Sequence, residues 1–235
     1  MNRFRTPRLL AGPAVGLVVL GAAAAGCSAD ERDQPPPAAT PQVLSVADVC
    51  AGLFSDEGGK GVERVLESTR FLVRAEERNP DVRAVAKAME DAYRSGRNIQ
   101  NMPQPVCEAA GETKDSGFIP SLRIMFTAYS KHAGEPPDFP GVSDSGVKVS
   151  TRQKANQLAF DCVSSRVGST QDVPLRIRVD FQERWDESKG AAALSRDYMA
   201  VTHSAALAVA KELGCANDGG LPARADGLPQ PEDRP

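Results

Sequence analysis

A strict two-residue alternation near the C-terminal end constrains the fold of this chain most. In residues 175–182, LRIRVDFQ, apolar and polar side chains alternate along the whole segment, so an extended strand there has one apolar face and one polar face. Residues 122–128 and 158–162 show the same period, and residues 105–110 and 146–150 show it more weakly. Strands with one buried and one solvated face favour antiparallel pairing.

Helical periodicity flanks these strands. Residues 191–213 carry apolar side chains every three or four positions, and Gly214 stands where a glycine commonly ends a helix. Asn79 followed by Pro80 predicts the start of a helix that ends at Gly96. Shorter helices are predicted after Ser45 and from residue 62, with a break at the glycine-rich residues 58–61. The fold class is therefore α+β, an antiparallel sheet of about four to five strands covered by N-terminal helices and a long C-terminal helix.

The first 26 residues have the three parts of a secretory signal peptide. Three arginines precede the apolar residues 9–20, and a small-residue stretch then ends at Gly26, directly before Cys27. The tetrapeptide Ala24-Ala25-Gly26-Cys27 resembles the bacterial lipobox, which implies cleavage after Gly26 and attachment of a diacylglycerol to the Cys27 thiol. The alternatives are a signal peptide cleaved without lipidation and an uncleaved anchor, because residues 9–25 approach the length of a membrane span.

The remaining chain divides by composition. Residues 27–43 are the lipidated cysteine and a proline-rich tether, residues 44–215 a single globular domain, and residues 216–235 a tail expected to be disordered. The whole chain has 28 basic and 31 acidic residues, and loss of a leader with three arginines and no acid changes the net charge from −3 to −6. An acidic domain is repelled by nucleic acid and by anionic lipid, so the acyl chains must supply the membrane attachment.

Five cysteines divide into one for the lipid and four for the domain. In an oxidising compartment the four predict two disulfides, and three pairings are possible. We favour Cys50–Cys107 and Cys162–Cys215, because the second pair would join a strand to the helix that packs on it. Free thiols or a metal site are the alternatives, but none of the four lies in a C-x-x-C pair or near a histidine.

No catalytic residue, metal-ligand set, cofactor motif or nucleotide motif stands out. The two histidines, His132 and His203, show no metal-binding spacing, and His203 lies off the apolar stripe, so we expect its side chain to be solvated. Residues 180–187, DFQERWDE, combine four carboxylates with Trp185. Such a set could serve an envelope hydrolase acting on glycans, or its carboxylates could simply favour the start of the following helix.

Two further features suggest contact surfaces. Arg123, Arg176 and Arg178 project from the polar side of the predicted sheet, where they form either a cationic patch for an acidic ligand or ordinary solvated positions. Residues 130–156 are long for a loop, and Phe139 within them is a candidate contact residue.

The layout of the chain resembles small secreted lipoproteins of Streptomyces-like actinomycetes, through the lipobox residues and the spacing of Cys50, Cys107, Cys162 and Cys215. This resemblance implies a lipid-anchored protein at the outer face of the cytoplasmic membrane and supplies no catalytic residues. We therefore expect a non-enzymatic binding or protein-interaction module of the cell envelope, whose partners are the membrane, through the lipid, and an envelope protein. An envelope hydrolase using the carboxylates near Trp185 is the alternative.

Overall fold

The computed structural model describes residues 42–50, 52–73, 80–98, 106–112, 120–130, 146–152, 155–184, 191–230 and 232–233. Their elements in chain order are β1 (Gln42–Leu44), α1 (Val46–Val49), α2 (Asp56–Leu66), β2 (Phe71–Val73), α3 (Val82–Arg94), β3 (Cys107–Gly111), β4 (Ser121–Ser130), β5 (Lys148–Arg152), β6 (Ala155–Cys162), β7 (Leu175–Arg184), α4 (Ala191–Leu213), the 3₁₀ turns Ala216–Gly220 and Ala225–Gly227, and β8 (Glu232–Asp233).

The predicted α+β class is confirmed. The described strands form one sheet in the order β1-β2-β3-β4-β7-β6-β5-β8, and every pairing is antiparallel except the parallel pairing of β5 with β8. The expected strand count was too low, because eight strands are present in the described residues. The strands β1, β2 and β8 have only two or three residues, which is too short for an alternating pattern to be visible.

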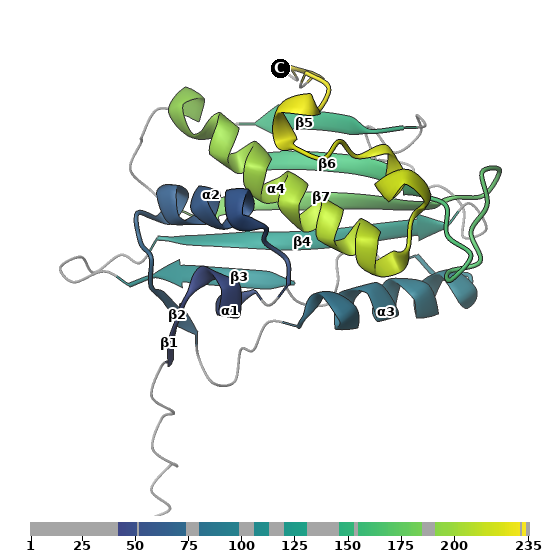
Figure 1. Ribbon diagram of the computed structural model, residues 1–235, viewed down its shortest axis with the longest axis horizontal. Coiled ribbons are helices and arrows are strands. Elements are labelled where there is room, and N and C mark those ends of the chain that lie inside the picture. The colour runs from purple at the N-terminus through teal and green to yellow at the C-terminus, as the bar shows by residue number, and fades with distance from the viewer. Residues whose placement is uncertain are drawn as a thin grey trace, which may run out of the picture. The chain divides into compact units, whose positions relative to one another are not determined.

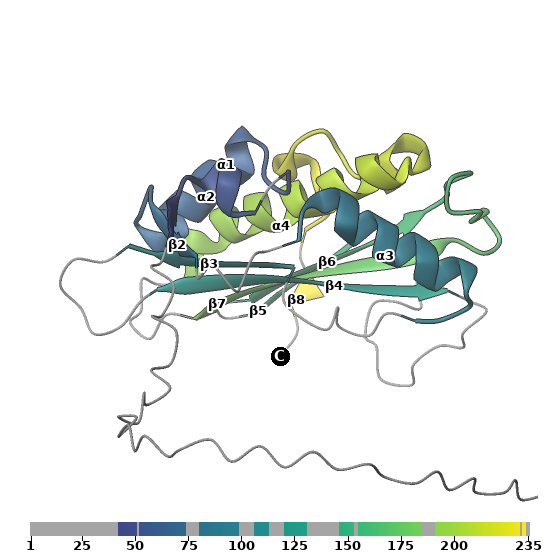
Figure 2. The same cartoon turned by 90° about the horizontal axis from the view of Figure 1, so that it is seen from below.

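The helices α1 to α4 lie on one side of the sheet, as the two views show (Figures 1 and 2). Within the sheet, the helix α4 packs mainly on β6 and β7, and its extent, Ala191–Leu213, matches the predicted segment. Gly214 follows it with a φ of +67°, the left-handed conformation that a glycine supplies at a helix end. The core between the layers comprises the inward side chains of β4, β7 and α4, among them Leu122, Ile124, Phe126, Ile177, Val179, Phe181, Val201, Ala205 and Val209.

The glycine-rich residues 58–61 lie inside α2, and the predicted break there was wrong. Ser55 caps this helix, with its hydroxyl accepting from the Gly58 amide. A Cβ on Gly58 would lie 2.4 Å from the Cβ of Ser204, and one on Gly61 would lie 2.9 Å from a methyl carbon of Val201. Glycine therefore permits the close approach of α2 to α4, which outweighs its poor helix propensity.

The predicted start of α3 at Asn79-Pro80 was also misplaced. The helix begins at Val82, and the Asp81 side chain caps it by accepting a hydrogen bond of 2.7 Å from the Ala84 amide. Asn79 lies outside the described residues, and Pro80 precedes the cap. Aspartate is about as good a helix N-cap as asparagine, and the cap is Asp81, two residues after Asn79.

The tail expected to be disordered is ordered over residues 216–230. It runs back along α4, and Leu221 and Leu228 are each only 7% exposed in contact with the core. The amide of Ala216 donates to the carbonyl of Val163 at 2.8 Å, next to the point where the tail leaves α4. The polar composition of residues 216–230 does not reveal that two leucines reach the core, and this is why the prediction failed.

Candidate functional site

Both predicted disulfides are present. Cys50 is bonded to Cys107 and Cys162 to Cys215, with Cα atoms 5.5 and 4.9 Å apart. The four cysteines are therefore neither free thiols nor metal ligands, and two disulfides fit an extracytoplasmic protein. The predicted lipidation and cleavage residues, Cys27 and Gly26, lie outside the described residues.

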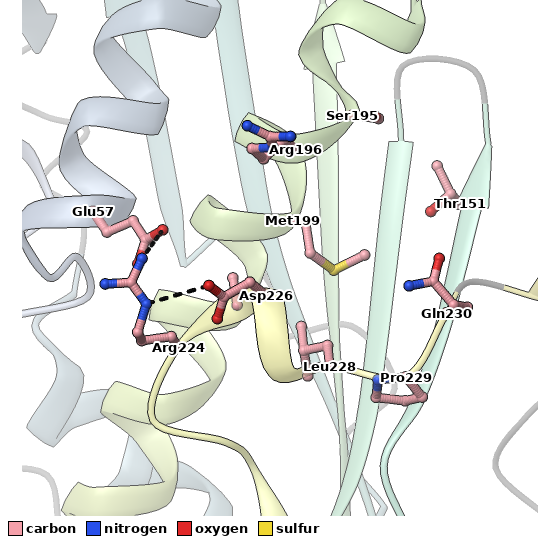
Figure 3. Close-up of a pocket in the computed structure, with 11 residues that line it drawn as sticks. Glu57, Thr151, Ser195, Arg196, Met199, Arg224, Asp226, Leu228, Pro229 and Gln230 are labelled. Atoms are coloured by element: carbon pink, nitrogen blue, oxygen red, sulfur yellow. Dashed lines mark ion pairs between the residues drawn. The ribbon is translucent and has the colours of Figure 1, made fainter.

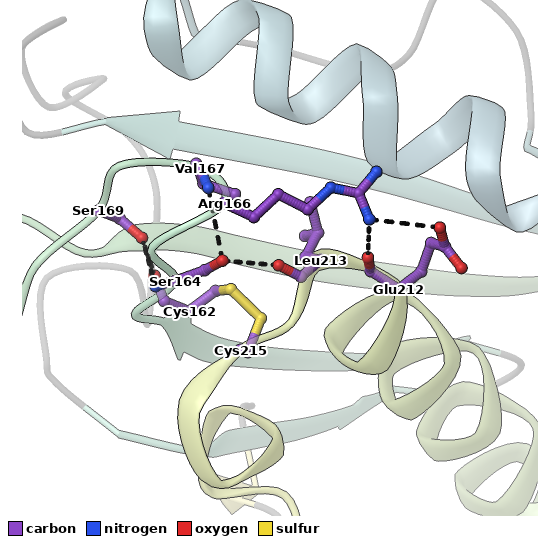
Figure 4. Close-up of a disulfide and its surroundings, with 8 residues drawn as sticks. All are labelled: Cys162, Ser164, Arg166, Val167, Ser169, Glu212, Leu213 and Cys215. Carbon is purple, nitrogen blue, oxygen red and sulfur yellow. Dashed lines mark hydrogen bonds and ion pairs between the residues drawn. A yellow bond between two sulfur atoms is a disulfide. The ribbon is translucent and has the colours of Figure 1, made fainter.

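The Cys162–Cys215 disulfide fixes the end of α4 to the end of β6 (Figure 4). The Ser164 hydroxyl donates to the carbonyl of Leu213 at 2.6 Å, and the Arg166 guanidinium donates to the carbonyl of Glu212 at 2.5 Å. These bonds satisfy carbonyls that have no partner within a helix end. The C-terminal segment thus starts from a rigid point.

The three arginines on the outer face of the sheet are each paired with a carboxylate. Arg123 contacts Glu108 at 3.1 Å, Arg176 contacts Asp161 at 2.9 Å, and Arg178 contacts Asp180 at 2.7 Å. The side chains of Arg176 and Arg178 are only 12% and 15% exposed. Neither a free cationic patch nor fully solvated arginines is therefore present. Burial in the same face raises the pKa of Tyr129 to about 12.

The described carboxylates of residues 180–187 lie on opposite faces of β7. Asp180 pairs with Arg178 on the outer face and accepts from the Gln157 amide at 2.6 Å. Glu183 accepts a hydrogen bond from the hydroxyl of Tyr198 on α4, against the inner face. Two positions an odd number of residues apart point to opposite sides of a strand, so these two cannot act on one substrate. Trp185, Asp186 and Glu187, like His132 and Phe139, lie outside the described residues.

His203 is buried, contrary to the expectation of a solvated side chain. It is 5% exposed, and its Nε2 lies 2.8 Å from the carbonyl oxygen of Pro222 in the C-terminal segment. Burial lowers its pKa, an effect that the contact with Pro222 opposes. The prediction failed because the segment that was expected to be disordered covers this side of α4.

The same segment forms one wall of a pocket of about 860 Å³ (Figure 3). The α4 residues of the pocket belong to its first three turns, and single residues come from α2 and β5. The described lining residues are Glu57, Thr151, Ser195, Arg196, Met199, Arg224, Ala225, Asp226, Leu228, Pro229 and Gln230. The pocket could not be predicted because six of these residues belong to the C-terminal segment that was expected to be disordered. Leu221 and Leu228, seven positions apart and each followed by proline, were the signal that could have revealed it.

Charge is distributed unevenly in the pocket. On one side, the guanidinium of Arg224 lies 3.8 Å from a carboxylate oxygen of Glu57 and 3.5 Å from one of Asp226. Two carboxylates share one cation there, which leaves that side net negative. Arg196, which projects from α4, is exposed and has no ion-pair partner in the described part of the chain.

Two apolar side chains, Met199 and Leu228, also line the pocket. Met199 and Leu228 face each other across the pocket (Figure 3). The amide of the buried Asn156 donates to the sulfur of Met199 at 3.4 Å, and its oxygen accepts from the Thr151 hydroxyl at 3.0 Å. The Thr151 and Met199 side chains are thus held in place by one buried amide, so part of the pocket is pre-formed.

Within the described residues, no cluster of three or more histidine, cysteine or acidic side chains is arranged to hold a metal ion. No helix in that part of the chain combines the length and the apolar character that crossing a bilayer requires. Comparison of the chain with protein families, curated proteins and solved structures finds no match.

Proposed function

We propose that this chain is a lipid-anchored binding protein at the outer face of the cytoplasmic membrane, and that its ligand binds in the pocket between α4 and the C-terminal segment. The pocket itself is the observation that carries the proposal. Its volume of about 860 Å³ falls within the range of about 300–1,000 Å³ typical of small-molecule sites. Seven of its eleven described lining residues are polar or charged and four are apolar, so the lining suits a polar, charged ligand with a small apolar part.

The signal peptide and Cys27 carry the anchoring part of the proposal, and the two disulfides support an extracytoplasmic location. A Cys27→Ala variant tests the anchor in cells fed a clickable palmitate analogue. We expect lipid labelling to disappear and the protein to leave the membrane fraction. A Cys162→Ala, Cys215→Ala double variant is the control for cysteine loss, and it should still be labelled. A Cys27→Ala protein that stays labelled and membrane-bound would refute the anchor.

Methyl NMR tests whether the pocket binds a small molecule of any class. The exported protein, purified from membranes in detergent, is titrated with fractions of a small-molecule extract of bacterial envelopes. We expect at least one fraction to shift the methyl signal of Met199, which lines the pocket, and to leave that of Met89 unchanged. Met89 is fully buried in α3 and belongs to the core, so it reports general perturbation. If no fraction shifts Met199 selectively, the pocket does not serve as the binding site.

A further inference from the structure

We infer that the pocket recognises a short zwitterionic peptide, with the peptide carboxylate on Arg196 and its ammonium group beside Glu57 and Asp226. This inference rests on the proposed function, because it names the ligand class for the same pocket. The inference is based on the two kinds of charge in the lining, a cation at Arg196 and an anionic group at Glu57 and Asp226. A ligand with only a positive or only a negative charge would pair with one of them and leave the other without a partner.

Arg196 is the group that would bind the carboxylate. It lies in the pocket lining and has no ion-pair partner within the described residues. A guanidinium presents its donors in a planar fork that matches a carboxylate, which makes two parallel hydrogen bonds possible. The second arginine of the described pocket lining, Arg224, is already shared between two carboxylates. Among the described lining residues, Arg196 is therefore the cation available to an incoming anion.

The Glu57–Arg224–Asp226 cluster is the complementary anionic side. Its contacts of 3.8 and 3.5 Å are longer than the roughly 2.7–2.9 Å typical of a charge-assisted hydrogen bond. The carboxylates thus keep acceptor capacity that a ligand ammonium could use. In Figure 3 the cluster lies on one side of the pocket, and Arg196 projects from α4 beside it. An ammonium group and a carboxylate on one small molecule can meet both.

The remaining lining favours a peptide over a smaller zwitterion. Met199 and Leu228 provide an apolar surface for a side chain, and Thr151 and Gln230 on the opposite side provide polar groups for a peptide amide (Figure 3). A pocket of about 860 Å³ suits a ligand of drug-like size. A tripeptide fills such a pocket better than a single amino acid does.

Isothermal titration calorimetry on the detergent-purified exported protein tests this inference with the tripeptide Ala-Leu-Ala. The probes are the free peptide, its N-acetylated form, its C-terminal amide and free leucine. We expect the free peptide to bind, and each of the two blocked forms to bind at least about tenfold more weakly, as loss of a charged hydrogen bond predicts. Free leucine keeps both charges, and we expect it to bind more weakly than the tripeptide because it fills less of the pocket. The Arg196→Gln variant should bind the free peptide as weakly as the wild type binds the amide, and it should bind the amide with unchanged affinity. Arg83→Gln, an exposed position on α3, is the matched control and should bind like the wild type.

Equal binding of the free and blocked peptides would overturn the inference, and so would binding of leucine as tight as that of the tripeptide. Absence of any peptide binding would overturn it as well. The Met199 experiment then separates the two proposals. If an extract fraction still shifts Met199, only the ligand class is wrong; if none does, the pocket is not a binding site and both proposals fail.

Discussion

The close crossing of α2 and α4 makes a quantitative prediction for Gly58→Ala. The added Cβ would lie 2.4 Å from the Cβ and 2.5 Å from the Oγ of Ser204. The Ser204 Cβ is fixed to the backbone of α4, so rotation of its side chain cannot relieve the contact. The helices must move apart, and the site of the clash is the hydroxyl that accepts from the Ser55 amide at 2.6 Å.

Three effects set the magnitude. Overpacking of a core costs about 1–3 kcal/mol, and the short contact places Gly58→Ala near the upper limit. Loss of the hydrogen bond to Ser204 costs about 1 kcal/mol more. Replacing glycine by alanine within a helix stabilises the helix by about 1 kcal/mol, which nearly offsets the loss of the hydrogen bond. We expect the free energy of unfolding to fall by about 3 kcal/mol, a decrease in Tm of roughly 6–12 °C for a domain of this size.

Urea unfolding followed by circular dichroism measures this change, and two neighbouring variants serve as controls. A Cβ on Gly59 would lie 3.1 Å from a methyl carbon of Val46, a side chain that can adjust, so Gly59→Ala should be neutral or slightly stabilising. Lys60→Ala, at an exposed position of the same helix, should change stability little. If Gly58→Ala were as stable as Gly59→Ala, close helix contact would not explain the glycines of α2.

Three further predictions concern the C-terminal third of the chain. Replacing Cys162 and Cys215 together by alanine opens a loop of 53 residues. Urea unfolding should show that the free energy of unfolding falls by about 4 kcal/mol. An unchanged value would mean that the hydrogen bonds at the end of α4 hold this region without the disulfide. Because burial lowers the pKa of His203, the unfolded chain takes up a proton at this histidine at a higher pH than the folded chain does. Unfolding free energy should therefore fall as the pH drops below about 6.5, and His203→Gln should flatten this part of the profile. Leu228→Ala should lower the unfolding free energy by about 2 kcal/mol and accelerate amide exchange in residues 216–230. It should also abolish the ligand-induced shift of the Met199 methyl signal. Unchanged amide exchange would contradict the role of Leu228 in holding the segment against the core.

The long, regular elements could be predicted from sequence because their burial pattern repeats. The strands β4 and β7 pair over ten positions, and each exposes alternate residues to the helices, so polarity follows the backbone geometry. The disulfide Cys162–Cys215 could be predicted for the same reason, because the apolar patterns of β6 and α4 place these elements on opposite sides of one interface.

Features that depend on a single close contact could not be predicted. Glycines ordinarily interrupt a helix, and nothing local in residues 58–61 shows that Ser204, far away in the chain, requires the missing side chains. The sheet arginines were misjudged in a related way. Their partners Glu108 and Asp161 lie on neighbouring strands, and only the strand order and register bring these charges together.

The candidate site depends on the part of the chain for which composition was most misleading. Ordering each residue costs about 1–2 kcal/mol, and burial of Leu221 and Leu228 returns only about 1.5–3 kcal/mol each. The leucines alone therefore cannot order residues 216–230. The disulfide at Cys215 fixes one end of the segment, prolines reduce its freedom when unfolded, and the bond between His203 and Pro222 adds a buried contact. The pocket wall is therefore ordered only by the combined effect of the disulfide, the prolines, the leucines and the His203–Pro222 bond. A ligand that bridges Arg196 and Asp226 should stabilise the segment further, so amide exchange in residues 216–230 should slow when the pocket is occupied.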